Sequence, residues 1–427
     1  MSKLWKKTAG KLHPLVEKYT VGNDPILDLT LFPYDLQGTT AHVKGLEKIG
    51  ILNKPELKKV LTELENLQKL WKKNQITITF EDEDCHTVIE NYLTKKLGDI
   101  GKKVHTGRSR NDQVLTAIRL YMKDQLKNLE KSTKKLAANF LKSAEKYAAL
   151  PFPGYSHTQQ AMLTSLGHYY LSFVESLIDD CALLEKIQNQ IDKNPLGSAA
   201  GFGVSLALPR NLTTQELHFK ETQINSLYCQ NSRGKFESLY LEGLSQIMMT
   251  LSKFANDLIL FTSQEFNFFT VKDELVTGSS IMPQKRNLDA MEILRGQTSV
   301  IFANQQMIKD ISKSLLSGYN RDLQLIKKPL IESTEILEMS LEIVEIYLKG
   351  ITPNEDEILK KINPAIFTAD IAIELAKKGM PFREAYKKAL AVKEEINLQK
   401  NIASKISLGG PGNLNLPYYK KQLKIKP

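Results

Sequence analysis

Long stretches with a helical pattern and no proline constrain the fold of this chain most. Proline is absent between Asn111 and Leu150, and apolar residues recur there at the spacing of one helix face. Those residues are Leu115, Ile118, Met122, Leu126, Leu129, Leu136, Phe140 and Ala144. A helix of this length exceeds the average helix of globular proteins, so it needs partner helices along most of its surface.

Similar patterns recur along the central sequence, and no proline lies between residues 210 and 282. The predicted helices are His157–Asn189, Phe236–Phe261, Asp289–Lys313 and Asp322–Leu348. Together with the first helix they predict a mainly α fold built on a central bundle of long helices. A bundle of this kind leaves apolar faces that one chain does not cover, so oligomerisation is a natural consequence.

Shorter elements precede the bundle. A helical pattern covers Gly38–Trp71, and the strict alternation of Ile76–Phe80 predicts a short strand. An acidic turn at residues 81–86 then leads into a helix at Thr87–Leu97. His86 lies in this turn, where a capping or core role is the ordinary explanation for a histidine.

The composition changes again after Pro353. Shorter helices are predicted at Asn354–Lys361, Thr368–Lys378 and Pro381–Leu398, and the glycine-rich tail around residues 409–412 is expected to be irregular. We therefore expect three domains, at residues 1–108, 109–352 and 353–427. The first is mixed but mostly helical, the second is the bundle and the third is small and helical.

Composition limits the classes of function. The chain has 427 residues, 42% hydrophobic and 25% charged, and a net charge of +10, as expected of a soluble globular protein. A basic excess is compatible with a nucleic acid, a membrane surface or an anionic substrate as partner. Most lysines alternate with acids, which is typical of solvated helix faces. We therefore expect neither nucleic acid nor membrane as a partner.

Cysteines and histidines give no metal-binding pattern. Cys85, Cys181 and Cys229 form no CxxC pair, and the seven histidines include no HxxxH pair. We expect no metal or cofactor, and a reducing cytoplasm as the location. No apolar stretch of signal-peptide length follows the first residues, and none approaches the length of a membrane span.

The segment Gly278–Asn287, with the sequence GSSIMPQKRN, concentrates catalytic groups in a loop. Ser279 and Ser280 offer hydroxyls, and Lys285 and Asn287 offer a cation and a neutral donor. A loop of this composition can carry a proton-transfer group beside groups that stabilise an anion. The ordinary alternative is a polar surface turn.

Three further segments contain polar groups near predicted helix starts. Thr106–Gln113 places two arginines where helix N–H groups already favour anions, although a helix cap with surface ion pairs is the alternative. Pro153–His157 opens a predicted helix, where the dipole favours neutral histidine. The side chains of Tyr319–Gln324 and Lys327 could bind an anionic ligand, and the alternative is that this segment is an exposed helix start. The glycines of Leu196–Gly203 match no phosphate-binding motif and predict a close-packed turn.

The whole segment Gly278–Asn287 resembles the signature loop of the fumarase/aspartase superfamily, lyases that release fumarate. His105–Gln113 and Gly318–Gln324 narrow the resemblance to the argininosuccinate lyase family. This resemblance implies reversible cleavage of L-argininosuccinate to L-arginine and fumarate, in arginine synthesis. It also implies a homotetramer in which each active site is shared between subunits.

The resemblance assigns roles to individual residues. Ser279 is the expected base, with Lys285 and Asn287 stabilising a doubly charged aci-carboxylate, and His157 polarised by Glu292 is the expected proton donor. The expected substrate-binding residues are His86, Ser109, Arg110, Asn111, Ser156, Tyr319, Gln324 and Lys327.

The sequence departs from the family pattern in places. Leu288 stands where proline is usual and Arg286 where lysine is common, and residues 4–7 differ from the usual N-terminal motif. A family arginine aligns with Gly234, and Arg233 is offset from it by one position. Three other functions remain open: another lyase of the superfamily, such as adenylosuccinate lyase, fumarase or a lyase of a modified argininosuccinate; a non-catalytic structural helical protein; and a basic RNA-binding protein.

Overall fold

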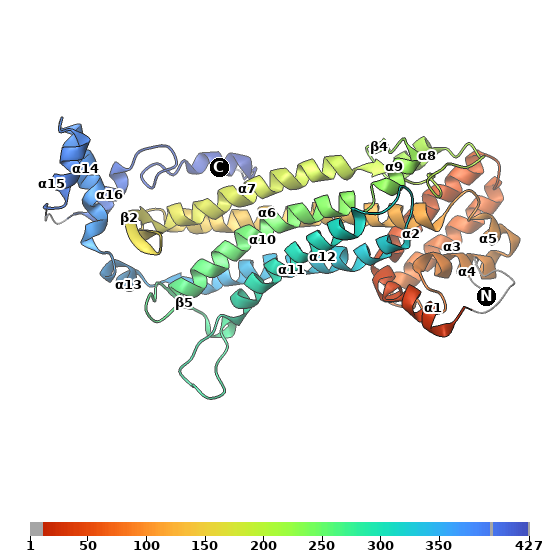
Figure 1. The fold of residues 1–427 in the computed structure, drawn as a ribbon, viewed down its shortest axis with the longest axis horizontal. Helices are drawn as coiled ribbons and strands as arrows, with labels where there is room; N and C mark the ends of the chain where they lie inside the picture. The colour runs from red at the N-terminus through yellow and green to blue at the C-terminus, as the bar shows by residue number, and fades with distance from the viewer. Residues whose placement is uncertain (1–11, 393–395, 426–427) are drawn as a thin grey trace. The chain divides into compact units, whose positions relative to one another are not determined.

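The computed structural model describes residues 12–392 and 396–425 (Figure 1). These residues form two compact units. Unit one comprises Met1–Asn128, Leu184–Leu244 and Ile301–Glu335, and unit two comprises Leu129–Leu183, Ser245–Val300 and Ile336–Pro427. The division into three domains stays a prediction, and the departure at residues 4–7 lies outside the described residues.

Helices dominate both units. Up to residue 231 the elements are α1 (Pro14–Val21), α2 (Asp24–Lys48), α3 (Lys54–Lys72), α4 (Cys85–Leu97), α5 (Asp99–Lys103), α6 (Arg110–Lys146), β1 (Pro151–Ser156), β2 (Gln159–Ser165), α7 (Leu166–Ile191), β3 (Lys193–Asn194), α8 (Arg210–Glu216), β4 (Glu221–Thr222) and α9 (Ser226–Asn231). The remaining elements are α10 (Lys235–Phe261), β5 (Phe269–Val271), η1 (Asp273–Leu275), α11 (Asp289–Ser312), η2 (Arg321–Ile326), α12 (Lys327–Gly350), β6 (Ile351–Pro353), α13 (Glu355–Lys360), η3 (Pro364–Phe367), α14 (Thr368–Lys377), α15 (Phe382–Ala389), α16 (Leu398–Ser404) and α17 (Leu416–Gln422). The long helices were predicted within a few residues at most ends, and the mainly α fold is confirmed.

The N-terminal helices of unit one share a hydrophobic core. Helices α2, α3 and α4 pack around Phe32, Leu46, Leu64 and Ile89, all buried. The start of α3 is fixed by a capping box, in which Asn53 and Glu56 each accept a backbone N–H of the other at 2.9 Å. These contacts position the N-terminus of α4, which lines the candidate site.

The predicted strand at Ile76–Phe80 is wrong. The segment has no regular structure, and none of the strand pairs in the described residues includes it. Its alternation has another cause, because Ile76 and Ile78 pack against the α2–α4 core while Thr77 and Thr79 are exposed. A strand needs a hydrogen-bonded partner, which periodicity alone does not supply.

Interlocking aromatic rings hold the helices of unit two together. Phe140 of α6, Phe173 of α7 and Phe254 of α10 contact one another, with ring centroids 5.1 to 5.4 Å apart. Edge-to-face and stacked pairs at this separation stabilise a core beyond the area they bury. These contacts give α6 two of the partner helices that its length predicted.

The predicted helix His157–Asn189 is wrong at its start. Residues 151–165 form an antiparallel hairpin of β1 and β2, and α7 begins only at Leu166. His157 and Thr158 form the turn with φ angles of 51° and 60°, the geometry of a tight two-residue hairpin turn. His157 therefore lies at a hairpin tip and not at a helix N-terminus.

The C-terminal part of unit two also differs from the sequence prediction. The predicted helix at Pro381–Leu398 ends at Ala389, and α16 starts separately at Leu398. Asn397 caps α16 by accepting the backbone N–H of Lys400 at 3.0 Å, which marks a new helix start. The segment at 409–412 is irregular as predicted, but it is followed by α17.

Candidate active site

A polar pocket of about 360 Å³ lies in unit one. It is formed by α1, α2, the start of α4, the start of α6 and the segment 319–327. Six of the predicted substrate-binding residues line it: His86, Arg110, Asn111, Tyr319, Gln324 and Lys327. The fold thus gathers residues that are separated by up to about 240 positions in the sequence, and the same pocket is also lined by acids of α2 and of the segment just before α4.

Lys327 is buried in the pocket wall between two carboxylates. Its Nζ lies 2.7 Å from Asp24 Oδ2 and 2.7 Å from Asp28 Oδ1. Burial acts to lower the pKa of Lys327, but Asp28 and Asp24 outweigh it and raise the pKa above its ordinary value. Burial also raises the pKa of Asp24 to about 6, despite the nearby ammonium group. The ammonium group is therefore charged at neutral pH and held in one place.

Arginines fix the rim of the pocket. Arg110 lies 3.2 Å from Asp84 and donates to Thr87 Oγ1 at 2.8 Å, which attaches the start of α6 to the start of α4. Arg321 pairs with Glu83 at 2.7 Å. Arg321 and Gln324 both donate to the carbonyl oxygen of Thr20 at 2.9 Å, at the end of α1. Gln324, predicted to bind substrate, here holds α1 against the pocket.

Arg233 is a buried pocket residue with spare hydrogen-bonding capacity. One Nη donates to the carbonyl oxygen of Leu323 at 3.2 Å, and the guanidinium carbon lies 5.4 Å from the ring centre of Tyr319. Its Nε and Nη1 have no hydrogen-bond partner among the described residues. Buried donors are normally satisfied, so an unsatisfied guanidinium beside a pocket is suited to a ligand carboxylate.

Asp112 organises the backbone beside the pocket. Its Oδ1 accepts the backbone N–H of Ser109 at 2.9 Å, and its Oδ2 accepts those of Gly197 and Ala199 at 3.0 and 2.9 Å. The first residues of the segment Leu196–Gly203 therefore form the close-packed turn that the sequence predicted and support the start of α6, whereas Phe202 and Gly203 are exposed. Ser109 lies in this network and is not among the residues that line the pocket.

The segment Gly278–Asn287 forms an open loop of unit two that extends away from the helices between β5 and α11 (Figure 1). Thr277 and Asn287 close its base through two backbone hydrogen bonds of 3.1 and 2.9 Å. Ser279 Oγ accepts the backbone N–H groups of Ile281 and Met282 at 3.3 and 3.2 Å. Such donors stabilise a hydroxyl that loses its proton.

His157, Ser156 and Glu292 are exposed on unit two. Within the described residues no hydrogen bond or ion pair joins His157 to Glu292, although the family resemblance of the sequence had implied such a pair. Both side chains are free to meet a ligand or another chain.

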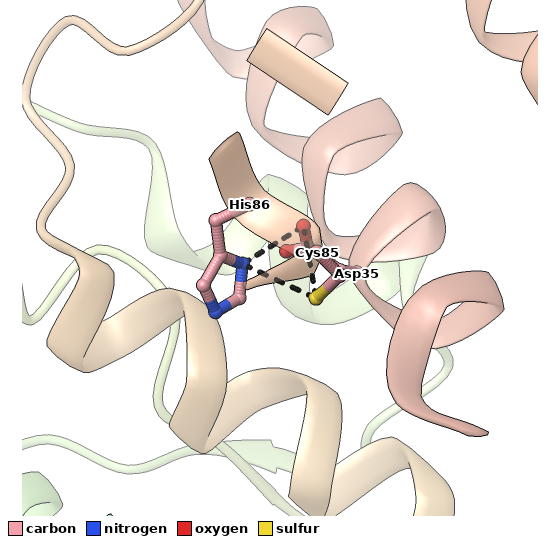
Figure 2. Close-up of side chains that lie close together, drawn as sticks. All are labelled: Asp35, Cys85 and His86. Atoms are coloured by element: carbon pink, nitrogen blue, oxygen red, sulfur yellow. Dashed lines mark hydrogen bonds and ion pairs between the residues drawn. The ribbon is translucent and has the colours of Figure 1, made fainter. Parts of the chain in front are cut away.

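Asp35, Cys85 and His86 lie together beneath the pocket of unit one (Figure 2). Asp35 Oδ2 is 2.9 Å from His86 Nδ1, and Cys85 Sγ is 3.8 Å from the same nitrogen. Sequence spacing missed this group because Asp35 comes from α2, while Cys85 and His86 begin α4. Burial acts to lower the pKa of His86, but Asp35 outweighs it and raises the pKa.

Comparison with known proteins decides the family. A family model described as "Lyase" matches residues 12–303. The argininosuccinate lyase of Thermotoga neapolitana is 42% identical over 385 residues, covering 90% of this chain and 96% of that protein. The chain belongs to the argininosuccinate lyase family. A second member, from Xanthomonas campestris pv. campestris, is 38% identical over 417 residues, covering 97% of this chain and 96% of its own.

Solved structures agree on the fold of the argininosuccinate lyase family. An EDDS lyase variant with bound fumarate superposes with a TM-score of 0.80 at 19% identity, covering 98% of this chain and 90% of that one. A class II fumarase from Schistosoma mansoni gives a TM-score of 0.73 at 16% identity, with 88% and 91% covered. These likenesses show that the chain has the fumarase/aspartase-type fold. The family model and the argininosuccinate lyase relatives show that the chain is a lyase. Among its described helices, none combines the length and apolar character needed to cross a bilayer.

The predicted residues of this argininosuccinate lyase family member thus fall into two groups. The pocket group lies in unit one together with Ser109, and the group of Ser156, His157, Ser279, Lys285, Asn287 and Glu292 lies in unit two. Their individual roles remain predictions. Sequence reasoning left the function of Arg233 open, and its missing hydrogen-bond partners are visible only in the folded chain.

Proposed function

We propose that this chain catalyses the reversible elimination of L-argininosuccinate to L-arginine and fumarate, with the residues of the two groups in the roles described below. Membership of the argininosuccinate lyase family supports the reaction. The observation that carries the assignment of the site is the gathering of six predicted residues around one pocket of unit one. The pocket contains both cations and carboxylates, which suits a substrate with a guanidinium group, an ammonium group and several carboxylates.

Arg233 is the proposed anchor for a substrate carboxylate. Lys327 and Arg321 are already paired with acids of the pocket at 2.7 Å, whereas two nitrogens of Arg233 lack partners among the described residues. A guanidinium group binds a carboxylate through two parallel hydrogen bonds. The guanidinium carbon of Arg233 lies 5.4 Å from the ring centre of Tyr319, a separation at which the face of the ring attracts the cation.

Ser279 is the proposed base. In its alkoxide form the serine removes a proton from the carbon next to a succinyl carboxylate, and the two backbone N–H groups that donate to its Oγ stabilise this alkoxide. Lys285 and Asn287 then stabilise the doubly charged aci-carboxylate. The C–N bond breaks, and the departing guanidine nitrogen receives a proton from His157, which Glu292 polarises. Fumarate and arginine leave, and transfer of the proton from Ser279 to His157, directly or through water, restores both residues for the next turnover.

The site is proposed to be completed by neighbouring subunits of a homotetramer. Helix α11 exposes Ile293, Val300 and Met307, seven residues apart, with exposed fractions of 64%, 37% and 43%. A repeat of seven is the pattern of a helix that packs along another helix. Exposed His157 and the exposed loop of Ser279 are then available to the pocket of a partner chain. A cytoplasmic location stays a prediction.

The activity is tested by fumarate release, followed through its ultraviolet absorbance. Purified protein should release fumarate from L-argininosuccinate, and Ser279→Ala should lower kcat by about a thousandfold or more. Ser280→Ala is the matched control and should keep activity. Release from adenylosuccinate or malate alone would overturn the assignment of the substrate, and equal loss in both serine variants would overturn the assignment of the base.

The shared site is tested by mixing two inactive variants. Ser279→Ala and Arg110→Ala change different groups, and hybrid tetramers should regain part of the activity because some sites receive both intact groups. Each variant alone should stay inactive. A mixture that assembles into hybrids and regains nothing would show that both groups act within one chain.

A further inference from the structure

Three different metal-ligand atoms meet behind the pocket of unit one. Asp35 offers Oδ2, Cys85 offers Sγ and His86 offers Nδ1, and these atoms all lie within 4.8 Å of one another (Figure 2). The side chains are almost fully buried. Asp35 belongs to the middle of α2 and the other two to the first turn of α4, so two packed helices hold the set together.

The separations are close to those of a coordinated ion. Zinc binds nitrogen and oxygen at about 2.0 Å and sulfur at about 2.3 Å in a tetrahedron, which places ligand atoms roughly 3.3 to 3.6 Å apart. The observed separations are 2.9 Å for oxygen to nitrogen, 3.8 Å for sulfur to nitrogen and 4.0 Å for sulfur to oxygen. Each observed separation therefore lies within about 0.4 Å of the range expected for a tetrahedral site.

The surrounding charges favour a cation at this point. Burial raises the pKa of the Cys85 thiol well above its ordinary value, and the carboxylates of Asp28, Asp35 and Asp84 raise it further. Asp28 is close enough to accept the backbone N–H of Cys85 at 3.1 Å. Lys327 acts in the opposite direction, and its ammonium group is paired with both Asp24 and Asp28 at 2.7 Å. A bound divalent ion would favour the thiolate form of Cys85 over the protonated thiol, because a thiol that coordinates a metal loses its proton.

The ion pair between His86 and Asp35 accounts for the arrangement without metal. It leaves the thiol without a strong partner, since its contacts with Asp35 and His86 are 4.0 and 3.8 Å long. Metal binding releases the thiol proton and the proton shared by His86 and Asp35, and the two anionic ligands then balance the charge of the ion. His86 and Asp28 also line the pocket, so an ion has a path inward.

We propose that Asp35, Cys85 and His86 form a site for a thiophilic divalent cation of the zinc, cobalt or cadmium class, placed directly behind the substrate pocket. Ligand softness selects this class, because one thiolate and one imidazole disfavour magnesium and calcium. Occupation removes His86 Nδ1 from Asp35 and rearranges the pocket wall. The ion therefore inhibits the enzyme by weakening substrate binding, a consequence that rests on the proposed function.

Cobalt(II) substitution tests the site without reference to activity. Full-length protein, reduced and freed of metal, is titrated with Co²⁺ alone and followed by absorption. We expect a sulfur-to-cobalt charge-transfer band in the near ultraviolet, saturating at one ion per chain. The band should vanish in Cys85→Ser and persist in Cys181→Ser and Cys229→Ser, which remove the other buried cysteines. His86→Gln should lower the affinity at least tenfold.

A parent protein without the band, or a band that survives in Cys85→Ser, would overturn the site. Circular dichroism shows whether each variant is folded, and His86→Gln gives a second measurement if Cys85→Ser is not. Inhibition is measured separately: Zn²⁺ should raise the KM for argininosuccinate at least fivefold in the parent and leave Cys85→Ser unchanged. Because the cobalt spectrum needs no turnover, failure of the proposed reaction leaves this test intact.

Discussion

The amide nitrogen of Gln160 donates a hydrogen bond of 2.6 Å to the carbonyl oxygen of Lys361. The amide oxygen of the same side chain accepts the backbone N–H of Asn363 at 2.9 Å. One glutamine of strand β2 therefore ties the hairpin that carries Ser156 and His157 to the segment between α13 and η3. The position of the proposed proton donor depends on this attachment, because the imidazole of His157 has no hydrogen bond or ion pair of its own among the described residues, and only its carbonyl oxygen accepts a hydrogen bond, from Thr158 at 2.6 Å.

Gln160→Ala should lower kcat for argininosuccinate about tenfold with little change in KM, because two hydrogen bonds that fix the hairpin are lost. Gln75→Ala, at an exposed position of unit one, is the control and should leave both constants unchanged. The measurement is steady-state fumarate release at several substrate concentrations. A fall of the same size in the control, or a change in KM alone, would show that Gln160 does not position the hairpin.

Arg233→Lys should raise KM for argininosuccinate at least tenfold and leave kcat within a factor of three. Lysine keeps the charge but loses the planar pair of donors that grips a carboxylate. Arg383→Lys, exposed on α15, is the matched control. Unchanged KM in the Arg233 variant would remove this residue from substrate binding and leave its unsatisfied nitrogens unexplained.

Gly234→Ala should destabilise the fold by roughly 2 to 5 kcal/mol. Gly234 has φ of 84°, and a Cβ there would lie 1.8 Å from Ser312 Oγ. The companion change Ser312→Gly removes the clash but not the backbone strain, so the double variant should recover part of the loss. Urea unfolding of all three variants measures this. Additive effects of the two substitutions would contradict a direct clash.

Asp180→Asn should stabilise the protein at pH 8 and not at pH 3.5. Burial raises the pKa of Asp180 to about 6, although Thr250 donates a hydrogen bond of 2.9 Å to its Oδ2. A carboxyl with a raised pKa binds its proton more tightly in the folded state, so the ionised form costs stability above pH 6. The cost fades as pH falls from about 6 toward the ordinary value of 3.8.

The expected gain for Asp180→Asn at pH 8 is about 2 to 3 kcal/mol, from the size of the pKa shift. Asp356→Asn, on an exposed position of α13, should show no gain at either pH. Both variants are compared with the parent by chemical denaturation at equal protein concentration, since an oligomer gains stability with concentration. A gain that is the same at both pH values would show that ionisation is not its cause.

The sequence by itself determined the long helices and the family. Helix formation depends on hydrogen bonds within one segment, and the apolar stripe at helical spacing reports directly which face is buried. The stretch from Asn111 to Leu150 therefore predicted α6 within a few residues. The loop Gly278–Asn287 was also recognisable, because its residues are adjacent in the sequence and no folding is needed to bring Ser279, Lys285 and Asn287 together.

Only the tertiary structure decided the hairpin, the pocket and the cluster behind it. A strand forms only where it has a partner. Ile76–Phe80 has an alternating pattern but no partner, and Pro151–Ser156 pairs with Gln159–Ser165, a segment that the sequence pattern had predicted to be helical. Asp35 meets His86 only when α2 packs on α4. Arg233 becomes notable only when burial leaves two of its nitrogens without partners. These features depend on contacts between distant segments, whose energies no local pattern encodes.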